Sequence, residues 1–141
     1  MKLVRITAPK LANFVGEFSD TPELAVNDKI GFYEPCELRA WMSKPKDNLL
    51  YAVLVGGRYA GFCFAKVMSP HWAMIDTFYI KPRYRRGGVG SFLQRGVEAA
   101  LRGKVRYVSR VTKADNAGMH AFLDRTGWAK RDSYVWFDKF L

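Results

Sequence analysis

The chain has 141 residues, of which 49% are hydrophobic and 15% aromatic, a composition typical of a globular domain that excludes a disordered protein. Its longest apolar stretches, such as LLYAVLVGG, are too short to span a bilayer, and the first residues, MKLVRITAPKLANF, contain no long uncharged apolar run. We therefore predict one domain, residues 1–141, with neither a signal peptide nor a membrane anchor.

The net charge of +10 is distributed unevenly. Residues 1–50 hold seven basic and seven acidic residues, whereas residues 51–141 hold sixteen basic and six acidic residues. This asymmetry favours an anionic partner for the second part of the chain. A solubilising surface would have the same composition, and nucleic acid is a further candidate partner.

The cysteine content excludes the commoner metal sites. Only Cys36 and Cys63 are present, without a CxxC pair or a nearby histidine pair, so we expect no metal. Two reduced thiols suit a reducing cytoplasm, where we expect the protein to work.

The first half of the chain is expected to contain most of the strands. KLVRIT, residues 2–7, alternates between apolar and polar residues as a strand does. Residues 8–46 are mixed, and EPCELRAWMSK, Glu34 to Lys44, indicates a helix. Leu49 to Val55, a Gly-Gly turn, and Arg58 to Val67 then predict two antiparallel strands.

A third strand is predicted for Trp72 to Ile80, after which the hydrophobic period changes. A helix is expected from Gly88 to Leu101, with Gly103 as its terminator, and a strand from Tyr107 to Thr112. A helix over about 116–126 and a closing strand over 133–140 complete the order β-α-α-β-β-β-α-β-α-β. This order predicts a mixed α/β sheet.

The segment KPRYRRGGVGSF, Lys81 to Phe92, lies between the third strand and the helix that follows it. The N-terminus of a helix presents unpaired backbone N–H groups and a partial positive charge, which attract phosphate. Glycines allow a ligand close to the backbone, and arginines add charge and bidentate donors. The segment is neither a Walker A loop nor a complete dinucleotide fingerprint. It predicts a diphosphate site, although a tight basic turn would have a similar composition.

The same segment resembles a motif of the GCN5-related N-acetyltransferase (GNAT) family, Arg/Gln-x-x-Gly-x-Gly/Ala, which Arg85, Gly88 and Gly90 match. The preceding IDTFYIKPRYRR matches the approach to that motif, and NAGMHAFLDRTGW, Asn116 to Trp128, resembles the Asn-led helix of the family. The resemblance implies the GNAT fold, an α/β fold with a mixed, mostly antiparallel sheet of six to seven strands flanked by about four helices.

The resemblance also implies acetyl-CoA as cosubstrate and an amine as acceptor. Backbone amides from Arg86 to Ser91 would hold the pyrophosphate, the main chain of Phe78 to Ile80 would pair with the pantetheine arm, and the fourth and fifth strands would splay apart for the thioester. The cofactor-binding residues implied in this way are Phe78, Tyr79, Ile80, Arg85, Arg86, Gly87, Gly88, Val89, Gly90, Ser91 and Asn116.

Asp76 is the candidate general base, because it matches the strand position where many family members have a glutamate. It is the only acid between Asp47 and Glu98, and a structural carboxylate at a strand edge is the alternative. The proton donor is less clear, since Leu123 occupies the position of the tyrosine that many members have. His120, Tyr134 and water are the alternatives left open.

The sequence thus predicts an N-acetyltransferase that moves an acetyl group from CoA to a primary amine by direct attack. The alternatives are a CoA-binding protein of this fold with lost or altered activity, and a nucleic-acid-binding protein that uses the basic C-terminal surface. The acceptor, a small molecule or a protein, is not specified, although Trp41, Glu34 and Glu37 lie near the variable acceptor region. A homodimer is compatible with the sequence, and no membrane partner is expected.

Overall fold

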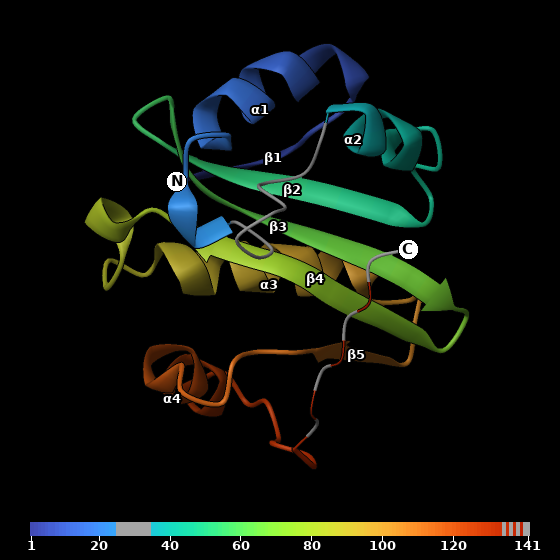
Figure 1. Cartoon of the computed structure of the whole chain (residues 1–141), viewed down its shortest axis with the longest axis vertical. Helices are drawn as coiled ribbons and strands as arrows, with labels where there is room; N and C mark the ends of the chain where they lie inside the picture. Colours follow the sequence, from blue (N-terminus) through green and yellow to red (C-terminus); the bar gives the residue numbers. More distant parts are fainter. Residues whose placement is uncertain (25–34, 134, 136, 138, 140–141) are drawn as a thin grey trace. The chain divides into compact units, whose positions relative to one another are not determined.

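The structure is a computed structural model that describes residues 1–24, 35–133, 135, 137 and 139 (Figure 1). The chain divides into two compact units, Met1–Arg110 and Val111–Leu141. No helix in the described ranges is long and apolar enough to cross a membrane.

The first unit is built on a five-stranded sheet with the order β1-β2-β3-β4-β5. Neighbouring strands are antiparallel, except that β4 and β5 are parallel, so the mixed, mostly antiparallel sheet is confirmed. The expected six to seven strands are wrong for the described residues, which form five. These strands are β1 (Lys2–Arg5), β2 (Asn48–Val55), β3 (Arg58–Ser69), β4 (Trp72–Ile80) and β5 (Tyr107–Arg110).

Two helices cover one side of this sheet, α1 (Leu11–Phe18) and α2 (Pro35–Met42) (Figure 1). Apolar residues at helical spacing give α1 a buried face, and its Phe14 and Phe18 have no exposed surface. Both rings pack on Phe62 of β3, with centroids 5.0 and 4.8 Å away. The predicted helix over 34–44 is confirmed by α2, while Glu34 lies outside the described residues. We call this side of the sheet the aromatic face.

The opposite side is covered by α3 (Val89–Leu101), the helix predicted from the change of period after the third strand (Figure 1). Its buried residues include Val89, Leu93 and Val97. Gly103 follows with φ 82°, the left-handed conformation that ends a helix. The remaining short elements of this unit are the 3₁₀ helices η1 (Ala8–Lys10), η2 (Pro22–Leu24) and η3 (Pro82–Tyr84).

The second unit contains α4 (Ala117–Arg125), as predicted. The side chain of Asn116 caps this helix by accepting a hydrogen bond from the Met119 amide at 3.1 Å, and Gly127 follows the helix with φ 84°. The strand predicted over 133–140 falls partly outside the described residues, and the described residues 133, 135, 137 and 139 form no strand.

Candidate functional site

The loop between β4 and α3 presents its backbone amides at the helix N-terminus. Gly88 caps α3 with φ 76°, and Arg86 also has a positive φ, 65°. The Gly88 carbonyl accepts from Phe92, at 2.9 Å, so the helical ladder begins there. The amides of Gly88 to Ser91 precede this first bond, so they have no partner within the helical ladder. The loop therefore offers a row of N–H donors and the positive end of a helix to an anion.

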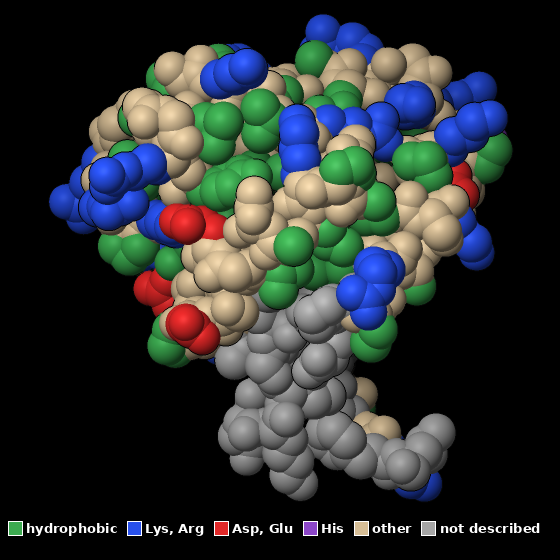
Figure 2. Space-filling model, turned by 90° about the horizontal axis from the view of Figure 1, so that it is seen from above, with side chains coloured by type: hydrophobic (Ala, Val, Ile, Leu, Met, Phe, Trp, Pro, Cys, Tyr) green, Lys and Arg blue, Asp and Glu red, His purple; other side chains and the backbone are tan. Residues whose placement is uncertain are grey.

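Arg85 connects this loop to the end of β4 and to η2. Its Nε donates to the Ile80 carbonyl at 2.8 Å, its Nη2 lies 3.4 Å from Glu23, and its guanidinium lies 5.7 Å from the centroid of the Tyr79 ring. These contacts tie the end of β4 to η2. Arg83 and Arg86 are exposed on the same loop, and Figure 2 shows Lys and Arg side chains at many places on the surface of this view. The local charge is therefore positive.

The last part of β4 lies beside one strand instead of two. The β4–β5 ladder ends at the pair Ile75 and Arg110, whereas β4 continues to Ile80. We call residues 76–80 the β4 end segment, and β3 is the only described strand that continues beside it. An extended group could pair with such an edge as an added strand.

A β-bulge begins the β4 end segment. Phe64 pairs with Thr77 and Ala65 pairs with Ile75, so Asp76 is the extra residue of β4. Bulges of this kind bend a strand and redirect side chains, and they are frequent beside active sites. Phe64 belongs to the core of the aromatic face, so its partner Thr77 points to that face as well.

Asp76 lies against a lysine that also contacts a tryptophan on the aromatic face. The Lys66 Nζ is 3.3 Å from Asp76 Oδ1 and 4.4 Å from the centroid of the Trp41 ring. The Thr77 hydroxyl is 3.3 Å from the other carboxylate oxygen of Asp76. Trp41 is half-buried and stacks on Phe64 at 4.8 Å. The carboxylate thus faces the side on which α2 lies, and a cation is already beside it.

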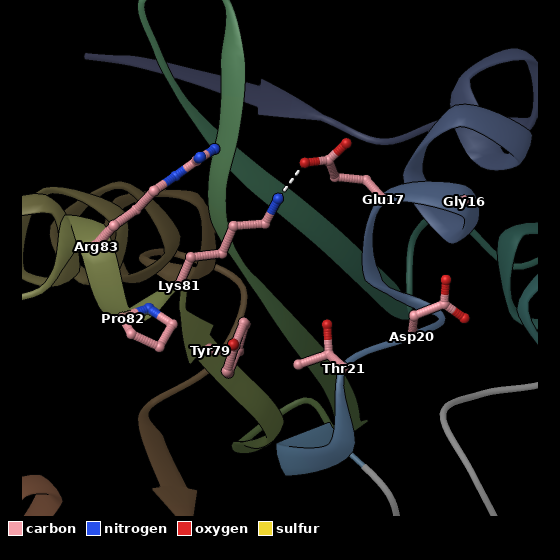
Figure 3. A pocket seen from close by; sticks show the side chains of 8 residues that line it. All are labelled: Gly16, Glu17, Asp20, Thr21, Tyr79, Lys81, Pro82 and Arg83. Carbon is pink, nitrogen blue, oxygen red and sulfur yellow. Dashed lines mark hydrogen bonds and ion pairs between the residues drawn. The ribbon is translucent and has the colours of Figure 1, made fainter.

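A cavity of about 570 Å³ opens between the end of α1 and the end of β4 (Figure 3). Lys81 reaches across it to pair with Glu17 of α1, and the Tyr79 hydroxyl donates to Glu23 at 2.6 Å. Burial and this hydrogen bond raise the pKa of Tyr79 to about 12. The lining residues are Gly16, Glu17, Asp20, Thr21, Tyr79, Lys81, Pro82 and Arg83. The sequence did not indicate this cavity, because its acidic wall belongs to a segment with no motif.

The α3 side of the β4 end segment carries a buried thiol and a buried guanidinium. Burial raises the pKa of the Cys63 thiol to about 12, although Arg110 opposes the shift, and burial lowers the pKa of Arg110. The Arg110 guanidinium lies 4.8 Å from the centroid of the Phe78 ring. No group of three His, Cys, Asp or Glu side chains in the described residues could hold a metal ion.

The second unit contains the remaining residues that the sequence analysis singled out. Asn116 is the cap of α4. The Nε2 atom of His120 lies 3.1 Å from the Lys113 carbonyl, and Leu123 is half-buried. Tyr134 lies outside the described residues. The described part of this unit thus adds no obvious proton donor.

Arg85, Gly88 and Gly90, the residues of the motif, lie in the loop and at the helix start between β4 and α3. A sequence model described as the acetyltransferase (GNAT) family matches residues 14–128, so the chain belongs to that family. No curated protein matches the chain in a sequence search.

Solved structures share the fold at low sequence identity. An aminoglycoside acetyltransferase from an uncultured soil metagenomic sample, in complex with sisomicin, has a TM-score of 0.80 and 15% identity over 99% of this chain and 95% of its own. The aminoglycoside N-acetyltransferase AAC(6')-Iy in complex with CoA has a TM-score of 0.77 and 12% identity over 99% and 100%. A transcriptional regulator from Bacillus halodurans C-125 has a TM-score of 0.76 and 16% identity over 98% and 99%. At these identities the likeness establishes the fold and leaves the substrate open.

Proposed function

We propose that the protein is an acetyl-CoA-dependent N-acetyltransferase that transfers the acetyl group to a primary amine by direct attack. The observation that carries the proposal is the row of amides from Gly88 to Ser91, which precede the helical ladder of α3 in the loop that follows the β4 end segment. Such a row binds a diphosphate without needing any side chain.

The residues of the first unit fit the cosubstrate. Gly87, Gly88 and Gly90 leave no side chain above the amides that would bind the pyrophosphate, and exposed Arg86 adds a positive charge. The main chain of Phe78 to Ile80 would pair with the pantetheine arm. Arg85 has a supporting role, because its Nε holds the Ile80 carbonyl. The role that the family resemblance gives to Asn116 stays a prediction.

Asp76 remains the candidate base. It projects from the bulge to the aromatic face, where an acceptor amine could approach the β4 end segment. A protonated amine must lose a proton before it attacks a thioester, and a carboxylate in this position could take that proton directly or through water. A backbone amide of the β4 end segment could donate to the carbonyl oxygen as charge develops on it. His120, Tyr134 or water would deliver the proton to the leaving thiolate, because Leu123 cannot.

The acceptor is proposed to be a small cationic amine. Asp20 adds a carboxylate to the cavity, whose Glu17 is paired with Lys81, and Trp41 contributes an aromatic ring next to Lys66. Two of the similar structures are described as aminoglycoside acetyltransferases, which agrees with an acceptor of that charge. Aminoglycosides and polyamines both belong to this class.

One observation favours a second candidate function, a CoA-binding protein with lost or altered activity. Leu123 carries no proton to donate, and the His120 ring nitrogen already contacts the Lys113 carbonyl. Such a protein would bind CoA tightly and release none from acetyl-CoA over a broad panel of amines.

Calorimetry with CoA tests the site first. The parent should bind CoA, and Arg86→Glu should weaken binding about tenfold, the equivalent of one charge-assisted contact. Arg95→Glu makes the same charge change at an exposed position farther along α3 and should bind nearly as the parent does. Absence of binding by the parent would refute both the enzyme and the CoA-binding alternative. Salt-dependent nucleic-acid binding that CoA does not displace would instead support a nucleic-acid-binding protein.

Turnover is tested by incubating the protein with acetyl-CoA and a panel of amines. Released CoA should be measured by chromatography, because exposed Cys36 reacts with thiol reagents. Asp76→Asn should lower kcat/KM by about a hundredfold while CoA affinity stays near the parental value. Asp124→Asn, an exposed change in α4, is the matched control. Equal turnover by Asp76→Asn and the parent would refute the assignment of the base.

A further inference from the structure

An amine of the protein itself lies beside the proposed base. The Lys66 Nζ is 3.3 Å from Asp76 Oδ1, and 29% of the lysine side chain is exposed. The Cα of Lys66 pairs with Met74 in the sheet, two positions before Asp76 along β4. The side chain therefore leans along β4 toward the bulge, where the β4 end segment begins.

Aromatic rings hold the lysine in this position. Its Nζ lies 4.4 Å from the centroid of the Trp41 ring and 5.3 Å from that of Phe64, both on the aromatic face. Cation–π contacts and the Asp76 carboxylate restrict a side chain that would otherwise sample many rotamers. An amine that is already oriented next to a base has the placement that an acceptor needs.

We propose that Lys66 is a self-acetylation site. This inference rests on the proposed function, since it requires acetyl-CoA beside the β4 end segment. Lys66 is the described lysine whose Nζ contacts the candidate base, whereas Lys81 pairs with Glu17 across the cavity. In the first turnover Lys66 takes the place of an external acceptor.

The step balances as an ordinary acyl transfer. The Lys66 ammonium gives one proton to Asp76, and the neutral amine attacks the thioester carbonyl carbon. A C–N bond forms, the C–S bond breaks, and the thiolate takes the second proton lost by nitrogen, so the products are an amide at Lys66, free CoA and one proton released to solvent. No oxidant or further reactant is needed.

Acetylation changes the electrostatics of the aromatic face. The amide product has no charge, so the ion pair with Asp76 and the cation–π contact with Trp41 are both lost. The Asp76 carboxylate then no longer has the positive charge of Lys66 beside it. We therefore expect that an acetylated chain binds a cationic acceptor differently from an unmodified one.

The test uses the full chain with isotopically labelled acetyl-CoA and no added amine. Peptide mass spectrometry should measure label at Lys66 and at the exposed lysines Lys10 and Lys104, which report chemical acetylation in the same sample. Lys66 should gain label at least about tenfold faster than either reference, because it is oriented beside a base. Its rate constant should not change when the protein is diluted, and excess CoA should suppress labelling at Lys66 alone.

Asp76→Asn should slow labelling at Lys66 and leave Lys10 and Lys104 unchanged, and Lys66→Arg should remove the labelled peptide. Labelling of Lys66 at the rate of the reference lysines, or a rate constant that falls on dilution, overturns the inference. If the protein binds CoA and acetylates an added amine while Lys66 stays unlabelled, the inference fails and the proposed function stands. If CoA does not bind, both fail.

Discussion

The two parts of β4, residues 72–75 and residues 76–80, differ in the described strands that lie beside them. Residues Trp72 to Ile75 lie between β3 and β5, and the Trp72 indole donates to Ser109 at 2.5 Å. Among the described strands, β3 alone continues beside the β4 end segment, residues 76–80. Its side chains are held instead by charged residues of other elements, Asp76 by Lys66 and Tyr79 by Glu23.

The first part of β4 is therefore structural, whereas the edge of the second part can be reached by a ligand. A strand with two neighbours has its backbone groups committed to the sheet, whereas a strand with one neighbour presents an edge. Native proteins keep such edges short or cover them, and a five-residue edge beside a bare helix N-terminus is suited to a ligand. Thiol labelling and denaturant unfolding of variants can measure how firmly β3 holds the β4 end segment.

The largest expected effect is the contrast between the two thiols. Cys63 pairs with Phe78 of the β4 end segment, and burial raises its pKa to about 12, so its thiolate fraction near neutral pH is about a thousandfold below that of an ordinary thiol. Thiol-reagent labelling of the native protein should therefore modify exposed Cys36 and spare Cys63 by at least about that factor. CoA should slow Cys63 labelling further. Equal rates for the two thiols would mean that the β4 end segment opens freely from β3.

A methyl group at Gly61 should weaken the same pairing. Gly61 lies opposite Ile80, and an added Cβ would lie 2.6 Å from Ile80 Cδ1 and closer still to the Tyr79 carbonyl oxygen. Because backbone atoms cannot easily move, Gly61→Ala should lower the free energy of unfolding by about 3 kcal/mol. Gly96→Ala is the control, since its new Cβ would meet only the flexible Leu3 side chain. Denaturant unfolding should show a change of less than about 1 kcal/mol for that variant.

Tyr79→Phe should remove the anchor to Glu23. Loss of a hydrogen bond to a carboxylate should lower the free energy of unfolding by about 2 kcal/mol at neutral pH. The folded pKa of about 12 lies above the ordinary value of 10.0, so this stabilisation is complete below about pH 10 and is lost as the pH rises toward 12. The gap between parent and variant in denaturant unfolding should therefore close across that window. A gap that stays constant to pH 12 would contradict the role of Tyr79.

The smallest expected effect is in the loop itself. Gly88 has φ 76°, where a side chain costs about 1 kcal/mol, whereas Gly87 has no such restriction and the atom nearest to its added Cβ would be 3.9 Å away. Gly88→Ala should lower the unfolding midpoint slightly, and Gly87→Ala should leave it unchanged. If the two variants have equal midpoints, the cap of α3 can change conformation without cost.

Local patterns in the chain anticipated much of the fold. Period-two and helical spacing located β1 to β5, α2, α3 and α4, and glycines marked the ends of α3 and α4 through positive φ values at Gly103 and Gly127. Residues 8–46 were mixed in pattern outside the helix predicted over 34–44. The helix α1, which lies in this range, proved to be a regular helix of eight residues. The closing strand predicted over 133–140 falls partly outside the described residues, so it stays a prediction.

The site was anticipated in part. The loop glycines and Asp76 were identified from their motif and lie at the end of β4, whereas Lys66, Glu17 and Glu23 were not singled out at all. Arg85 is predicted to bind the cosubstrate, and in the structure its Nε donates to the Ile80 carbonyl.

By itself the sequence determined the periodic elements, their order, the glycine-rich loop and the family, because each depends on residues that are near neighbours in the chain. Only the tertiary structure decided that Asp76 occupies a bulge beside Lys66, and that Glu23 meets Tyr79, which is 56 residues further along. Such contacts depend on register and packing between separate elements, so no local pattern of residues can encode them.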